Sequence, residues 1–256
     1  MRIATYNVNG VNGRLPVLLR WLEMTQPDVV CLQELKVTDQ DFPMEAIRSA
    51  GYSAIVHGQK TYNGVAILSR DEAAEPERGF GDGADDSASR LVAARFGQLH
   101  VVSAYVPNGA EVGSDKWAYK LSWLGRLRAW LDRRFTRTDL VALCGDFNVA
   151  PEPRDVCDPD AWAASVLFHP EARAALEHVK AWGLVDAFRM HCPDAGHYSW
   201  WDYRMLAFPR NQGLRIDHVL LSEPLAARCR SAVIQRDERK GQQPSDHVPV
   251  VVELEL

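Results

Sequence analysis

The 256-residue chain lacks several features that would place it in other classes of protein. Its five cysteines are widely spaced without a CxxC pair, which argues against a zinc site or a disulfide framework and favours a reducing compartment. No apolar run approaches the roughly 18 residues of a membrane span, and the N-terminal segment is too polar for a signal peptide. We therefore expect a soluble, cytoplasmic protein with no membrane partner.

The chain also lacks an excess of positive charge. Its net charge is -5 and its pI is near 5.9, whereas a protein that simply coats nucleic acid is normally basic. Net charge is nevertheless a weak guide to a catalytic cleft, because acidic metal ligands lower the total while a local basic rim still binds phosphate. Composition alone leaves nucleic-acid binding undecided.

Short apolar segments rich in Val, Ile and Leu recur along the chain and predict strands. They are residues 3–6, 29–32, 65–68, 91–96, 100–106, 140–144, 216–221, 232–234 and 248–254. Helical periodicity predicts helices at residues 14–24, 117–135 and 171–182. The acidic segment 71–89 is predicted to be a surface loop. Because the sequence contains no linker-like segment and no internal repeat, we expect one α/β domain spanning residues 1–256.

Polar residues follow or begin six of these strands, where an α/β scaffold usually exposes functional groups. They are Asn7, Asn9, Gln33, Glu34, Lys36, Tyr105, Asn108, Asp146, Asn148, Asp217, Ser245, Asp246 and His247. Any one of them is more often a turn former or a cap than a ligand. Six ends that all carry carboxylate, amide or imidazole groups indicate a shared site.

These residue types suit phosphodiester hydrolysis, which needs neutralised phosphoryl oxygens and an activated water. Glu34 with an amide such as Asn9 could anchor Mg²⁺, which prefers oxygen ligands and needs only one or two carboxylates. Asp217 lies within an apolar strand, where an unpaired carboxylate is costly, so we expect it to pair with a histidine. Alone, His247 after Asp246 would be interpreted as a capping pair. Without a GxSxG elbow or a P-loop, no covalent intermediate is expected.

Seven motifs occur in one order along the chain: TYNVNGV, CLQELKV, NGVAILS, AYVPNG, GDFNVAP, GLRIDHVLLS and SDHVPV. In order and wording they resemble the exonuclease III family of apurinic/apyrimidinic (AP) endonucleases, within the DNase I-like phosphodiesterases. The resemblance runs from residue 2 to residue 254. It implies a four-layer α/β sandwich in which two mixed sheets pack face to face, helices lie outside, and the active site lies at one rim.

The resemblance also implies ligands for the metal and the phosphate. Glu34 is similar to the principal metal ligand, with Asn9 and Asp246 near the metal. Asn7 and Asn148 resemble the amides that hold the scissile phosphate or the water. The resemblance also implies that Lys36 and Asn108 contact the DNA backbone or support the site.

Four further residues resemble the catalytic groups of that family. Asp146 would activate the nucleophilic water or protonate the leaving group. Tyr105 would place its hydroxyl near the phosphate, either as a phenol or as a phenolate. His247 would contact a phosphate oxygen, with Asp217 as its buried partner.

The strings SWWDYR and GLRIDH are similar to the family's pocket for a flipped-out abasic sugar. The resemblance implies apolar walls from Trp200, Leu214 and Ile216 that accept a bare deoxyribose. Extruding an abasic residue also costs less stacking energy than extruding a base. Two segments depart from the family pattern: loop 205–212 leaves the preference between abasic and base-bearing sites open, and the acidic loop 81–87 is not expected to lie against DNA.

Other conspicuous residues are expected to be structural. His218 should face away from Asp217 because neighbours in a strand alternate, and only one of Trp200 and Trp201 should line a pocket. Tryptophans at helical spacing are expected to pack, namely Trp117, Trp123, Trp130 and Trp182. Arginines 126, 128, 133, 134 and 137 are interpreted as a solvated helix face.

Together these features predict hydrolysis of the phosphodiester 5′ to an abasic site, dependent on Mg²⁺ or Mn²⁺ and leaving a 3′-hydroxyl. The resemblance adds 3′-to-5′ exonuclease and 3′-end repair on double-stranded DNA with abasic sites or blocked 3′ ends, by a monomer. Two alternatives stay open. One is a phosphodiesterase of the same fold that acts on RNA, a phosphoinositide or an undamaged duplex; the other is a catalytically silent binding module, against which intact Glu34, Asp146 and His247 argue.

Overall fold

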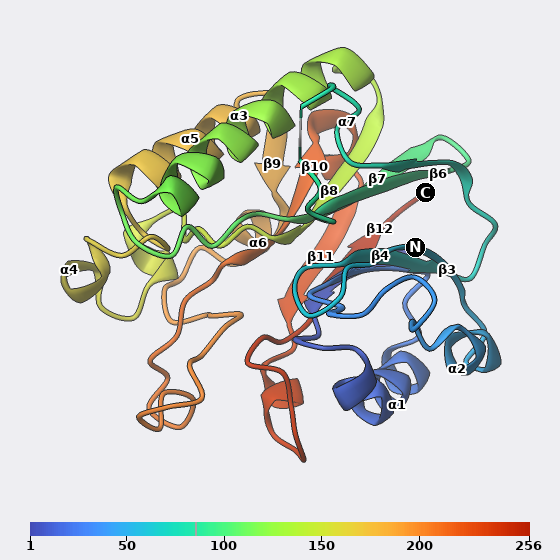
Figure 1. Cartoon of the computed structure of the whole chain (residues 1–256), viewed down its shortest axis with the longest axis horizontal. Coiled ribbons are helices and arrows are strands. Elements are labelled where there is room, and N and C mark those ends of the chain that lie inside the picture. Colours follow the sequence, from blue (N-terminus) through green and yellow to red (C-terminus); the bar gives the residue numbers. More distant parts are fainter. Residues whose placement is uncertain (85) are drawn as a thin grey trace.

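Two six-stranded mixed sheets pack face to face in the computed structural model, which describes residues 1–84 and 86–256 (Figure 1). The first sheet has the order β11-β12-β1-β2-β4-β3. Its strands are β1 (Arg2–Asn7), β2 (Val29–Gln33), β3 (Ser53–His57), β4 (Val65–Ser69), β11 (Cys229–Ile234) and β12 (Val250–Leu254). The second sheet has the order β5-β6-β7-β8-β10-β9. Its strands are β5 (Ala74–Arg78), β6 (Leu91–Phe96), β7 (Leu99–Tyr105), β8 (Leu140–Asp146), β9 (Leu184–Asp186) and β10 (Asp217–Ser222).

Helices cover the outer face of each sheet and complete the four layers (Figure 1). On the first sheet lie α1 (Leu15–Thr25) and α2 (Met44–Ser49), and on the second lie α3 (Asp115–Arg134) and α5 (Pro170–Lys180). The short elements are η1 (Asn12–Arg14), η2 (Pro153–Asp155), α4 (Pro159–Trp162), α6 (Ala187–His191), α7 (Glu223–Ala226) and η3 (Arg236–Arg239). The predicted α/β sandwich is confirmed. No helix within the described ranges has the length and hydrophobicity needed to cross a bilayer.

Three hydrophobic clusters hold these layers together. One lies between the two sheets and includes Val29, Val101 and Val219. Another joins the second sheet to α3 and α5, and the third joins the first sheet to α1 around Trp21. The strands read as nearly continuous apolar runs because both of their faces are covered. The four tryptophans expected to pack are all buried in the cluster under α3 and α5.

Three strands were not predicted, and one of them corrects the expected loop 71–89. β5 lies inside that segment and pairs with β6 at the edge of the second sheet. Its sequence AEPER is polar and contains Pro76, which only an edge strand tolerates. β3 is a short edge strand and β9 has three residues. Edge strands bury little apolar surface, so their sequences carry little hydrophobic pattern.

Arg126 of α3 is not simply solvated as expected, because it pairs with the acidic loop. Its guanidinium lies 2.8 Å from Asp82 and 2.5 Å from Asp86. Within the predicted acidic loop 81–87, Asp85 lies outside the described residues. Asp82 and Asp86, which precede and follow Asp85 in this loop, both contact α3 through Arg126.

The strand register brings the ends of both sheets to one rim. Tyr105 and Asp146 are partners in the parallel pair β7–β8, and Asp217 is opposite Asp146 in the antiparallel pair β10–β8. Just before them, a Cβ added at Gly145 would lie 1.9 Å from the carbonyl oxygen of Ala104. Glycine at this position therefore allows the close approach of β7 and β8 beneath the site.

The substitution Gly145→Ala is expected to lower the free energy of unfolding by about 1–3 kcal/mol, as typical for overpacking. Gly125→Ala is the matched control, because Gly125 is exposed on α3 with no atom near the added Cβ. It should raise stability by about 0.5–1 kcal/mol through helix propensity. Thermal unfolding of both variants measures this, and equal melting temperatures would contradict the packing argument.

Candidate active site

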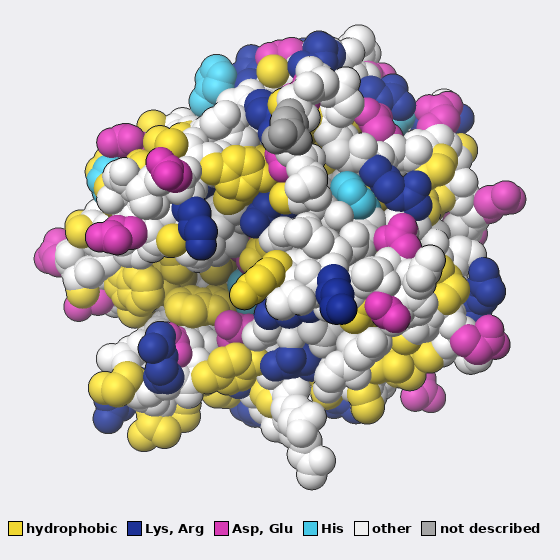
Figure 2. All heavy atoms as spheres, viewed as in Figure 1, with side chains coloured by type: hydrophobic (Ala, Val, Ile, Leu, Met, Phe, Trp, Pro, Cys, Tyr) yellow, Lys and Arg dark blue, Asp and Glu magenta, His cyan; other side chains and the backbone are white. Residues whose placement is uncertain are grey.

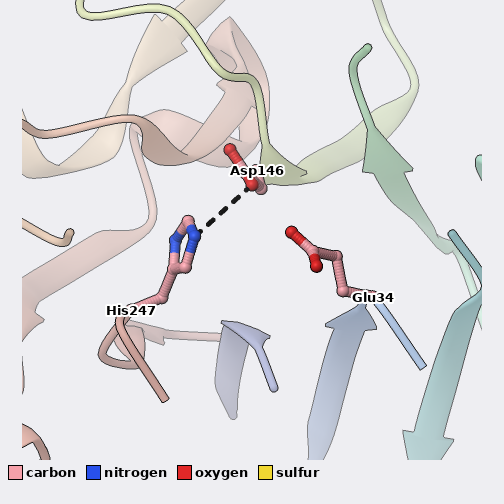
Figure 3. Close-up of side chains that lie close together, drawn as sticks. All are labelled: Glu34, Asp146 and His247. Carbon is pink, nitrogen blue, oxygen red and sulfur yellow. Dashed lines mark ion pairs between the residues drawn. The ribbon is translucent and has the colours of Figure 1, made fainter. Parts of the chain in front are cut away.

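Glu34, Asp146 and His247 come from distant parts of the chain and point toward one another at the rim (Figure 3). One atom of each side chain lies within 4.8 Å of the other two. The cluster forms because β1, β2, β7 and β8 end at this edge, where the antiparallel β10 begins and the segment before β12 passes. The first sheet supplies Glu34 and the second supplies Asp146, so the site bridges the two sheets.

The Glu34 carboxylate is held in its ionised form. Its Oε1 accepts hydrogen bonds from Asn7 Nδ2 and the Tyr105 hydroxyl, both at 2.9 Å, and its Oε2 lies 2.9 Å from Lys36 Nζ. Burial opposes ionisation, but Lys36 and Asn7 outweigh it and lower the pKa of Glu34 below its usual value. Glu34 is therefore a permanent negative charge at the base of the site.

The oxygens of Glu34 and Asn9 converge on a single positive group. The Lys36 ammonium contacts both Glu34 Oε2 and Asn9 Oδ1. Asn9 Nδ2 donates to Asp246 Oδ1 at 2.8 Å, and Trp200 Nε1 donates to the other Asp246 oxygen at 3.0 Å. Two oxygen donors that already share a cation form a donor set that fits Mg²⁺.

His247 is held as an imidazolium by buried carboxylates. Its Nδ1 lies 2.9 Å from Asp217 Oδ2, and its Nε2 lies 3.7 Å from Asp146 Oδ2. Burial alone would lower the pKa of His247, but Asp217 and Asp146 outweigh it and raise the pKa to about 10. An imidazolium has no free lone pair, so His247 is a proton donor toward a phosphate and does not ligate a metal.

Asp146 is poised between its charged and neutral forms. Its Oδ2 accepts from Asn7 Nδ2 and its Oδ1 from the backbone N–H of Asn148, both at 2.9 Å. Burial, with the nearby carboxylates of Asp217 and Glu34, raises the pKa of Asp146 to about 7 against the opposing charge of His247. A pKa near the working pH suits a group that accepts and releases a proton.

Of the two forms that the resemblance leaves open for Tyr105, the surroundings favour the neutral phenol. Its hydroxyl donates to Glu34. Burial, together with the negative charges of Glu34 and Asp146, raises the pKa of Tyr105 well above its ordinary value. The side chain therefore contributes an O–H donor.

Asn108 and Asn148 lie side by side at the end of the second sheet. Asn108 Nδ2 donates to Asn148 Oδ1 at 3.1 Å, and Asn148 Nδ2 donates to the carbonyl of Val106 at 3.0 Å. Asn148 is buried and its φ is +49°, in the left-handed region that asparagine adopts more readily than most other residues with a Cβ. This turn directs the amide toward Asp146.

An apolar pocket of about 470 Å³ opens beside Trp200. The rings of Trp162 and Trp200 lie 6.2 Å apart at 89°, and exposed Met205 lines the same pocket. Figure 2 shows hydrophobic side chains gathered in the hollow on this side of the molecule. Trp162 was not recognised from the sequence, because α4 has only four residues and gives no periodic pattern.

Two of the three expected walls of that pocket lie beneath it. Leu214 is 0% exposed and Ile216 is 1% exposed, so both belong to the hydrophobic core and offer a ligand no surface. Leu214 exchanges backbone hydrogen bonds with Trp200 and supports it from below. Trp201 is fully buried, and His218 bonds to the Val149 carbonyl, in agreement with their expected structural roles.

These layers and this constellation of carboxylates, amides and imidazolium at one rim define a class of metal-dependent phosphoesterases. The family model described as the endonuclease/exonuclease/phosphatase family matches residues 4–247, and the chain belongs to that family.

Relatives with known names are similar over their whole length. The chain is 36% identical to exodeoxyribonuclease III of Haemophilus influenzae, in an alignment covering 99% of this chain and 100% of that protein. An AP endonuclease from Archaeoglobus fulgidus superposes with a TM-score of 0.97 at 37% identity, covering 100% of both chains. A 3′ phosphatase from Neisseria bound to a product DNA hairpin gives 0.97 at 36% identity, with the same coverage.

The His247–Asp217 pair generates a prediction about pH. Because the folded-state pKa of about 10 exceeds the ordinary value of 6.5, the pair's stabilisation is fully present below pH 6.5 and is lost as the pH rises through 10. In metal-free protein, NMR should find the His247 ring protonated at pH 8, and Asp217→Asn should lower its pKa. The signal of exposed His178 serves as reference. A wild-type ring that titrates near 6.5 would refute the assignment.

Proposed function

We propose that the chain is a metal-dependent DNA repair nuclease that hydrolyses the phosphodiester 5′ to an abasic site and leaves a 3′-hydroxyl. The same site would remove nucleotides or blocking groups from 3′ ends. The convergence of Glu34, Asp146 and His247, each in a different protonation state, carries this proposal. The names of the similar proteins, an exodeoxyribonuclease III, an AP endonuclease and a DNA-bound 3′ phosphatase, support the same activities.

Glu34 and Asn9 would hold the metal, with Asp246 orienting Asn9. We propose Mg²⁺, with Mn²⁺ as a substitute, because the donors are hard oxygens. When bound, such an ion neutralises charge on the phosphoryl group and lowers the pKa of a bound water. Lys36 would then exchange its contacts with Glu34 and Asn9 for a phosphate of the DNA backbone.

His247 would donate its Nε2 proton to a phosphoryl oxygen as a charge-assisted hydrogen bond. Asp217 holds the opposite ring nitrogen, so it fixes both the orientation and the charge of the imidazolium. Donors fixed in place before the reaction are worth more than donors that must reorient, because charge grows on the phosphoryl oxygens during it. The amides of Asn7 and Asn148 would add neutral donors.

Asp146 would accept the proton of the attacking water. Its contacts with Asn7 and Asn148 leave it fixed, and its pKa near 7 gives it both a substantial ionised fraction and real basicity. The neutral acid is tolerated there because it relieves repulsion from Glu34 and Asp217. As the P–O3′ bond breaks, this proton would pass from Asp146 to the leaving 3′-oxygen, which gives the 3′-hydroxyl.

The substrate we propose is duplex DNA with an abasic site or a blocked 3′ end, acted on by a monomer. The pocket between Trp162 and Trp200 adjoins Asp246 through the Trp200 indole. It would receive the sugar of an extruded abasic residue, whose removal from the helix costs little stacking energy.

The variants Glu34→Gln, Asp146→Asn and His247→Ala should each lower kcat for incision of an abasic oligonucleotide by about 10²- to 10⁴-fold. Chelation should abolish incision by the wild type, and Mg²⁺ or Mn²⁺ should restore it. Glu171→Gln, on the exposed first turn of α5, is the matched carboxylate control and should keep full activity. Cutting retained by all three variants would reject the proposed mechanism. Faster turnover of RNA or a phosphoinositide in the same panel would reject the substrate.

Trp162→Ala is expected to distinguish the pocket from the catalytic centre. Loss of this wall should lower incision at an abasic site by about tenfold. Removal of a 3′ phosphate should change much less, because no residue has to leave the helix in that reaction. Equal losses on both substrates would show that Trp162 does not contact an extruded sugar.

A further inference from the structure

Lys120 of α3 is a buried cation next to the site, outside the residues considered so far. Its side chain is fully buried, and its Nζ donates to three backbone carbonyls. These belong to Asn108 at 3.0 Å, Asn148 at 2.7 Å and Val166 at 2.7 Å. An ammonium has three protons, so the three carbonyls satisfy it completely.

The three carbonyls come from three different loops. Asn108 lies between β7 and α3, Asn148 follows β8, and Val166 precedes α5. The close approach of α3 to the first loop is visible at Gly109, where φ is +97° and an added Cβ would lie 3.0 Å from Lys120 Cδ. Lys120 is therefore an attachment point that all three loops share. Pairwise bonds also link these loops: the Asn148 amide donates to the Val106 carbonyl, and the Ala150 N–H donates to the Leu167 carbonyl.

Burial of the charged Lys120 ammonium destabilises the fold because the charge loses its hydration. Burial lowers the pKa of Lys120 to about 7, and the Asp146 carboxylate only partly offsets this. No carboxylate in residues 1–84 and 86–256 forms an ion pair with it. A well-packed apolar side chain often stabilises a fold as much as a buried charge does. The three hydrogen bonds offset part of this cost and hold the three loops at fixed positions relative to α3.

We propose that Lys120 is a positioning residue: by holding the main chains of Asn108 and Asn148 together, it fixes the directions in which their side-chain amides face the phosphate. Asn148 depends most on this positioning, because both its side-chain amide and its backbone N–H contact Asp146. Lys120 itself touches neither substrate nor metal. The inference rests on the proposed nuclease function.

The test compares Lys120→Met and Lys120→Gln with the control Leu127→Ala, on the oligonucleotides used above. Lys120→Met removes all donors at similar length and should lower kcat by about 10- to 100-fold with KM little changed, as expected when catalytic groups shift by about an ångström. Lys120→Gln keeps two donors, so its kcat should lie between those of the wild type and Lys120→Met. If Lys120→Met does not fold, Lys120→Gln takes its place in the test. Leu127, two turns along α3, is fully buried, so Leu127→Ala should lower the melting temperature yet keep kcat.

A double-mutant cycle with Asn148→Ala separates positioning from general stabilisation. If Lys120 acts through the Asn148 amide, Lys120→Met should cost less than about threefold in kcat once that amide is absent. Losses that multiply in the double variant, or a kcat of Lys120→Met equal to that of Leu127→Ala, would overturn the inference. Wild-type protein without nuclease activity would instead reject the proposed function, so the two failures are distinguishable.

Discussion

The arrangement of the site depends on three carboxylates that gather at one rim, where Lys36 and His247 are the cations that pair with them. Glu34, Asp146 and Asp217 approach one another because the ends of two sheets meet there. The His247 imidazolium lies between Asp217 and Asp146 and compensates most of the repulsion. The Asn7 amide donates to both Glu34 and Asp146, so one neutral donor stabilises the two carboxylates. Burial among these carboxylates raises the pKa of Asp146, whereas Lys36 and Asn7 lower the pKa of Glu34.

Much of the fold could be predicted because its central strands are covered on both faces. Such strands must be apolar along their whole length, so β2, β4 and β8 are visible as hydrophobic runs with polar residues at their ends. β5 is the opposite case, because an edge strand gains little from burial and its sequence AEPER obeys no hydrophobic rule. The strands in the interior of the sandwich are therefore easier to predict from the sequence than its edge strands.

The sequence predicts which residues form the candidate site better than it predicts their protonation states and exposure. Motifs identify which residues gather, but the neutral phenol of Tyr105 depends on how many carboxylates surround it, and that number exists only after folding. The pocket shows a similar limit. Leu214 and Ile216 have the right chemistry for a wall, yet they alternate with Arg215 in a buried segment. The half-buried Trp162, from a four-residue helix, lines the pocket instead.

Glu34 and Asp146 differ in their acid–base character because their surroundings move their pKa values apart. Lys36 and Asn7 keep Glu34 ionised, which suits a ligand for a divalent cation. Asp146 is deeper and faces two other carboxylates, so its proton is held near neutral pH. Exchanging the two environments would place the weak acid at the proposed metal site and the permanent anion where the water is proposed to lose its proton, which would weaken both proposed tasks. Environment, more than residue type, therefore assigns the roles.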